Sequence, residues 1–125
     1  MKMMKISKRA YVLAAVAVTM VVRTTGAAAP TWTTTFFCTP MNVAMFAAQR
    51  MHVRCTTGGS PGGNIVYFAF SAKKKDAAPM LDLLLSAKAQ GKHLMIYYNP
   101  DDLSGQKIGC ATNDCRLIVG AELRD

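Results

Sequence analysis

The sequence lacks a hydrophobic run long enough to cross a membrane. Its main charge-free apolar stretch, residues 10–22, is shorter than the ~20 residues that a transmembrane helix needs. Basic residues precede this stretch, and the small residues TTGAAAP follow it. That order is typical of a secretory signal peptide. We therefore expect a signal peptide over residues 1–28, one exported domain over residues 29–125, and no stable membrane insertion.

The expected mature chain also lacks a strong net charge. The full sequence has 15 Lys and Arg against 7 Asp and Glu, which gives a net charge of +8. Five of the basic residues lie before residue 29, so 10 basic and 7 acidic residues remain and the charge falls to +3. This value is too small to predict nucleic-acid binding. The basic cluster at residues 73–75 is expected to be a solvated loop, with a patch for an anionic partner as the alternative.

Motifs typical of enzymes and cofactor sites are missing as well. No serine lies in a nucleophile-elbow motif, and no pair of carboxylates has a spacing that suggests glycosidase chemistry. The glycine-rich segment 56–64 lacks the Lys-Ser/Thr of a phosphate-binding loop, and a strand pattern rather than a helix follows it. We therefore predict a protein that is not an enzyme and has no cofactor.

Isolated polar residues do not change this prediction. His52 and His93 alternate with apolar neighbours, so each is expected on the exposed face of a strand. Asp101 and Asp102 have the oxygen ligands that a cation prefers, but a turn after Pro100 explains both of them. We predict no metal site from these residues.

The four cysteines all lie in the expected mature chain. An even number in an exported protein indicates disulfides, and no Cys-x-x-Cys motif suggests a redox centre. The alternative is a zinc site that combines His52 with Cys55, Cys110 and Cys115. We predict the disulfides Cys38–Cys55 and Cys110–Cys115, the second of which closes a short loop and mainly holds its shape.

Alternation and turn signals predict most of the strands. Residues 29–41 are rich in threonine and are expected to form an extended arm or edge segment, with Trp32 packed on the core or an edge. Segment 56–64 is a turn with four glycines and one proline, of the kind that antiparallel strands flank. Strands are expected within residues 42–55, 65–72, 92–99 and 116–124.

One strong helix is expected over residues 77–90. Asp76 is a good N-cap candidate, and Gly91 suits the position after the last turn. Its expected core-facing residues are Met80, Leu81, Leu84, Leu85 and Ala87, and its polar face carries Asp82, Ser86 and Gln90. Three or four strands, this helix and two further strands predict an α+β fold. The expected architecture is a small antiparallel OB-like five-stranded barrel with the helix between strands 3 and 4.

Four short motifs lie in the second half of the chain: a helix ending in Gln90-Gly91, the strand residues Ile96-Tyr97-Tyr98, the close pair Cys110 and Cys115, and Val119-Gly120 in the last strand. Over residues 65–125 the chain thereby resembles the binding (B) subunit of the subtilase cytotoxin family, whose members are pentameric AB-type bacterial toxins. The resemblance implies a secreted or periplasmic bacterial protein that binds a glycan or a protein and forms a homo-pentamer.

Tyr97 and Tyr98 are the candidate ligand-binding residues. Neighbouring strand residues point to opposite faces, so one tyrosine is expected in the core and the other is free to stack on a sugar. The alternative is a monomeric periplasmic interaction or inhibitor protein with no glycan binding. A small exported zinc-binding protein is a third hypothesis.

Overall fold

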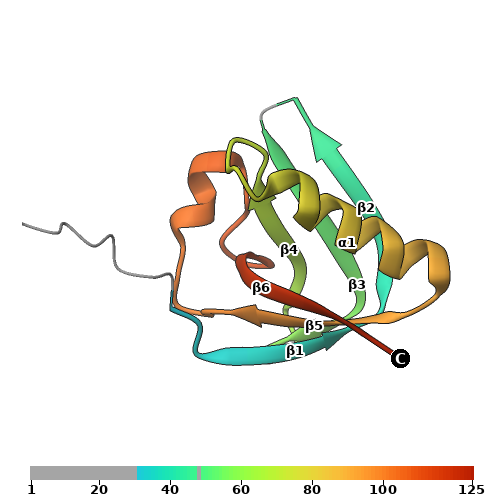
Figure 1. The fold of residues 1–125 in the computed structure, drawn as a ribbon. Coiled ribbons are helices and arrows are strands. Elements are labelled where there is room, and N and C mark those ends of the chain that lie inside the picture. Colours follow the sequence, from blue (N-terminus) through green and yellow to red (C-terminus); the bar gives the residue numbers. More distant parts are fainter. Residues whose placement is uncertain (1–30, 48) are drawn as a thin grey trace, which may run out of the picture.

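The computed structural model describes residues 31–47 and 49–125, so the predicted signal peptide lies outside the described residues. In chain order the elements are β1 (Thr34–Cys38), β2 (Pro40–Phe46), β3 (Arg50–Gly59), β4 (Ile65–Ser71), α1 (Ala77–Gln90), β5 (His93–Tyr98), the short 3-10 helix η1 (Ser104–Ile108) and β6 (Cys115–Arg124). All six strands belong to one sheet, against which α1 packs (Figure 1).

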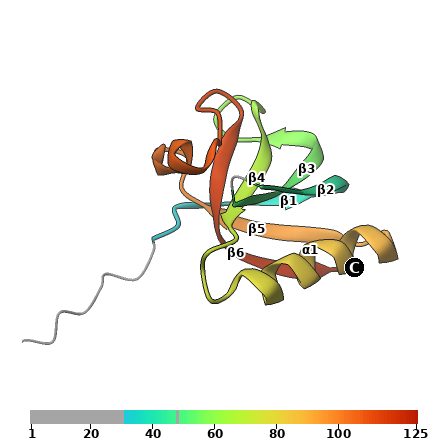
Figure 2. The ribbon, with the colours of Figure 1, turned by 90° about the horizontal axis from the view of Figure 1, so that it is seen from above.

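The strand order in the sheet is β1-β5-β6-β4-β3-β2. Every neighbouring pair is antiparallel except β4 and β6, which run parallel. The two edge strands, β1 and β2, are consecutive in the chain and are separated by Thr39 alone. The chain thus passes directly from one edge of the sheet to the other, and the sheet has to curve strongly for this to happen (Figure 2).

The predicted five-stranded antiparallel barrel is therefore wrong. The structure has six strands in one open, mixed sheet, and its helix follows the fourth strand. Part of the error lies in residues 29–41, where the expected extended arm or edge segment contains the complete edge strand β1 and the start of β2. The parallel pairing of β4 with β6 spans a connection that includes α1 and β5, and local periodicity carries no signal for such a pairing. The coarser α+β composition is compatible with the structure.

The core forms on the inner face of the curved sheet. Met51, Val53 and Cys55 are buried along β3, as the alternation predicts. The same period of two buries a second set on β5, namely Leu94, Ile96 and Tyr98. Since α1 lies against β2, β5 and β6, it covers this core from one side (Figure 1).

Helix α1 has the predicted bounds but not all of the predicted contacts. It ends at Gln90 and is followed by Gly91, whose φ of 64° lies in the left-handed region and whose N–H is directed at the carbonyls of the last turn. Asp76 occupies the predicted N-cap position, but its side chain makes no capping hydrogen bond. Leu84 is completely buried, whereas Leu85, also expected in the core, is 46% exposed.

Both disulfides of the structure join the cysteines that the sequence analysis paired. Cys38–Cys55 links the end of β1 to β3, beside the turn at Thr39. Cys110–Cys115 closes the loop between η1 and β6. The described residues contain no free cysteine, so the zinc alternative is wrong: its cysteines are bonded to one another and not to a metal.

The two neighbouring leucines of α1 provide a test of this packing. Replacing the fully buried Leu84 by alanine leaves a cavity in the core and is expected to lower the free energy of unfolding by about 2–5 kcal/mol. Leu85→Ala is the matched control, and we expect it to change the free energy of unfolding of the monomer by about 0.5 kcal/mol or less. Urea denaturation followed by circular dichroism measures both values. Equal losses would contradict the assignment of the buried face.

Candidate functional site

The two tyrosines predicted to bind ligand lie on opposite faces of β5. Tyr98 points into the core and is 0% exposed, with its ring edge-on to Phe68 at 4.9 Å between centroids. Its hydroxyl donates a hydrogen bond to the Ser60 carbonyl at 2.9 Å, and burial raises its pKa. Because no part of its ring reaches the surface, Tyr98 has no face to offer a ligand.

Tyr97 lies on the outer face and forms a surface platform together with Trp32. The two ring centroids are 5.0 Å apart with an interplanar angle of 73°, an edge-to-face contact. Trp32 remains 52% exposed, so the expectation that it packs on an edge is met while most of its surface stays free. Beside the rings lies a hollow of about 430 Å³, which is lined by Trp32, Tyr97, Val119, Gly120 and Ala121.

Charged groups on β6 border this Trp32–Tyr97 platform. The Tyr97 hydroxyl donates to a carboxylate oxygen of Glu122, and this hydrogen bond is the main reason why the pKa of Tyr97 is raised. The other Glu122 oxygen forms an ion pair with Arg124 at 2.7 Å. Gly120 pairs with Tyr97 across the two strands and has no side chain, which leaves the floor of the hollow open.

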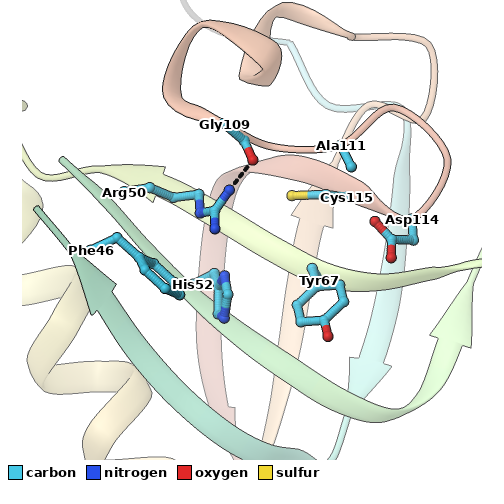
Figure 3. A pocket seen from close by; sticks show the side chains of 8 residues that line it. All are labelled: Phe46, Arg50, His52, Tyr67, Gly109, Ala111, Asp114 and Cys115. Atoms are coloured by element: carbon cyan, nitrogen blue, oxygen red, sulfur yellow. Dashed lines mark hydrogen bonds between the residues drawn. The ribbon is translucent and has the colours of Figure 1, made fainter. Parts of the chain in front are cut away.

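A second pocket lies on the outer face of β3, at a place that the sequence analysis did not single out (Figure 3). It has a volume of about 360 Å³. Its lining residues are Phe46 from β2, Arg50 and His52 from β3, Tyr67 from β4, and Gly109, Ala111, Asp114 and Cys115 from the segment that holds the second disulfide. The alternation in the β3 sequence is enough to place Arg50 and His52 on one face of the strand. The residues beside them, from β2 and β4, are identified only by the strand pairing in the structure.

His52 lies in the floor of this pocket, and the expectation that it is exposed is wrong. It is 8% exposed, because Phe46 and Tyr67 enclose it from the two flanking strands at centroid distances of 5.1 Å and 5.0 Å. Burial and the nearby cation of Arg50 lower its pKa from 6.5. The imidazole is therefore neutral at pH 7 and can both donate and accept a hydrogen bond.

Arg50 is fixed at one end of the same pocket. Its guanidinium lies over the Phe46 ring at 4.6 Å from the centroid and donates to the carbonyl of Gly109 (Figure 3). Within the described part of the chain, neither Arg50 nor Arg54 forms an ion pair, and the buried Nε of each has no hydrogen-bond partner. Buried donors without partners are rare in proteins.

The loop above the pocket is held in place by buried polar contacts. The carbonyl of Asp114 accepts hydrogen bonds from the N–H groups of Val66 and Tyr67, both at 3.0 Å. Arg116, only 7% exposed, donates to the carbonyls of Pro100 at 2.5 Å and Thr112 at 2.7 Å. These bonds and the Cys110–Cys115 disulfide fix the wall that carries Asp114 and Gly109.

The remaining candidate residues have structural roles. The His93 ring is hydrogen-bonded to the Thr39 hydroxyl at 2.9 Å. Asp101 and Asp102 lie in a turn, where the Asp102 carboxylate accepts the N–H of Ser104 at 2.9 Å. Lys73, Lys74 and Lys75 are exposed. Among the described residues, no group of three or more His, Cys, Asp or Glu side chains is arranged to hold a metal ion.

Comparisons with known proteins do not assign the chain to a family. No protein-family model matches the chain, and neither a curated protein nor a solved structure matches it. Over residues 31–47 and 49–125, no helix has both the length and the apolar character that a membrane crossing requires. The resemblance to the toxin B subunit therefore stays a prediction from the sequence.

The buried histidine gives a prediction for stability. Because the folded state lowers the pKa of His52, the unfolded chain binds a proton more readily, and the free energy of unfolding should decrease as the pH falls below 6.5. Above that value the contribution of His52 is constant. An NMR titration of the His52 ring is expected to give a midpoint below 6.5, and His52→Gln should reduce the pH dependence of unfolding. A midpoint at or above 6.5 would contradict the enclosed position of the ring.

Proposed function

We propose that this protein is an exported, non-catalytic binding protein that resembles a toxin B subunit and binds a glycan on the Trp32–Tyr97 platform. The carrying observation is a tryptophan that is more than half exposed and yet held edge-on against a tyrosine. Aromatic rings fixed in this way offer an apolar face to a sugar ring at a low cost in side-chain entropy. Two disulfides support export into an oxidising compartment, secreted or periplasmic.

The polar groups beside the platform are better suited to binding a glycan than to catalysing a reaction on it. Sugar hydroxyls need hydrogen-bond donors and acceptors next to an apolar face, and Glu122 and Arg124 supply both. A catalytic carboxylate would need to exchange protons with a substrate. Glu122 already accepts the Tyr97 hydroxyl and forms the ion pair with Arg124, so both of its oxygens are engaged.

The platform residue Trp32 can be tested against a matched exposed aromatic residue. Trp32→Ala removes the stacking face and is expected to weaken binding to the best glycan of an array about tenfold or more, a loss of about 1.4 kcal/mol or more. Phe37→Ala is the control, since Phe37 is also exposed but lies at the other end of β1. Equal losses, or no glycan bound at all, would refute the platform as a glycan site.

A second candidate function is a monomeric interaction protein without glycan binding. The observation that favours it is the edge strand β2, where Met41, Met45 and Phe46 are exposed. An edge strand with apolar side chains is able to pair with a strand of another protein.

The assembly state separates the two candidates. In the toxin-like hypothesis we expect a ring of five copies in which the polar face of α1, with Asp82, Ser86 and Gln90, contacts neighbouring copies. The exposed Leu85 of the same helix is then available to join this contact. Native mass spectrometry of the processed protein should then give a pentamer, and Leu85→Lys should dissociate it. A monomer at micromolar concentration would remove the avidity on which weak glycan binding depends and would favour the second candidate.

A further inference from the structure

The pocket on β3 shares no lining residue with the Trp32–Tyr97 platform, so its role is separate from the proposed function. Its volume of about 360 Å³ lies near the lower end of the roughly 300–1,000 Å³ that is usual for small-ligand sites. Its wall is fixed by a disulfide and its floor is built on paired strands. A pocket of this kind is largely formed before a ligand arrives.

One end of the pocket is prepared for a negative charge. The Arg50 guanidinium is held between the Phe46 ring and the Gly109 carbonyl, so little side-chain freedom is left to lose on binding. The Gly109 carbonyl uses only one of the several N–H donors of the Arg50 guanidinium. No carboxylate of the described residues lies within ion-pair distance of that guanidinium. A planar guanidinium with unused N–H groups matches the two oxygens of a carboxylate.

The middle of the pocket is aromatic. Phe46, His52 and Tyr67 form a row of tilted rings across β2, β3 and β4. A flat, apolar group packs well beside such rings. The neutral His52 adds a hydrogen-bonding nitrogen without adding a charge that would have to be desolvated.

The opposite end is negative. In Figure 3 the Asp114 side chain lies across the pocket from Arg50, with Tyr67 beneath it. Its carboxylate forms no ion pair with another described residue. Because a carboxylate accepts hydrogen bonds only, this end suits a hydroxyl or an amine and repels a second anion.

We propose that the pocket between β2, β3, β4 and the Cys110–Cys115 loop binds a small, flat carboxylate. The carboxylate group lies at Arg50, the flat body lies against His52 and Tyr67, and a hydroxyl or amine at the far end donates to Asp114. The site is distinct from the glycan platform, and either one can exist without the other.

The probe that carries all three features is 4-hydroxyphenylacetate. Isothermal titration calorimetry of the processed protein is expected to show saturable binding at millimolar probe concentration. Its neutral amide, 4-hydroxyphenylacetamide, differs only at the charged end and should bind about tenfold more weakly or worse, because the charge-assisted bonds to Arg50 are lost. Phenylacetate lacks the hydroxyl and should bind more weakly than 4-hydroxyphenylacetate. Absence of saturable binding, or equal binding of acid and amide, would overturn the proposal.

Variants assign the charged end to Arg50. Arg50→Met keeps the apolar stem and should reduce the affinity for the probe about tenfold or more, whereas Arg50→Lys should retain part of it. Lys88→Met removes one positive charge at an exposed helix position and is the control for a general charge effect. Trp32→Ala should leave probe binding unchanged, which keeps this test independent of the glycan platform. Equal losses for Arg50→Met and Lys88→Met would refute the assignment.

A readout on the unmodified protein covers the case in which an Arg50 variant does not fold. The charged and titratable groups around His52 are Arg50 and Arg54 on β3, Tyr67 on β4 and Asp114 in the loop, while β2 contributes the uncharged Phe46. A carboxylate bound at Arg50 offsets the cation that disfavours protonation of His52. The NMR titration midpoint of His52 should therefore rise when the probe is saturating, and binding should tighten as the pH falls. An unchanged midpoint under saturating probe would place the probe elsewhere and overturn the proposal.

Discussion

The structure depends on a single covalent constraint: the two edges of the sheet are joined by one residue, Thr39. β1 ends at Cys38 and β2 begins at Pro40, so the end of one edge strand and the start of the other have to meet in space. The sheet meets this requirement by curving around the core. The Cys38–Cys55 disulfide and the hydrogen bond from the Thr56 N–H to the Thr39 carbonyl hold the junction together. Removing either edge strand would expose the inner face on which the core is built.

This curvature separates a packed inner face from an outer face on which both candidate sites lie. On β5, the same alternation that buries Tyr98 turns Tyr97 outward to meet Trp32. On β3, it buries Met51 and turns His52 outward, where Phe46 and Tyr67 then enclose it. An outward side chain on a strongly curved sheet is thus not always an exposed one, because bulky neighbours on the flanking strands can cover it.

The Cys110–Cys115 disulfide fixes the shape of a loop that forms one wall of the pocket on β3. A bridge across so short a loop removes little chain entropy, so its main effect is on shape. Here the loop supplies the Gly109 carbonyl that fixes Arg50 and the Asp114 side chain at the far end of the pocket. Arg116 ties the base of this loop to the turn at Pro100. Part of the polar character of the pocket is therefore set by the stapled segment and not by the sheet.

Interactions between residues close together in the chain were enough to predict many of the secondary-structure elements of this protein. Helix α1 was predicted with its bounds, because its apolar stripe repeats at helical spacing and Gly91 directly follows its last residue. The positions of β4, β5 and β6 were also predicted to within about one residue at each end. Both cysteine pairs were predicted, and so was the placement of Tyr97 and Tyr98 on opposite faces of their strand. The sixth strand, the parallel pairing of β4 with β6, and the enclosure of His52 were decided only by the tertiary structure. These features depend on contacts between different strands, and the free energy that selects them comes from packing. Such packing gives no periodic pattern in the sequence of either strand.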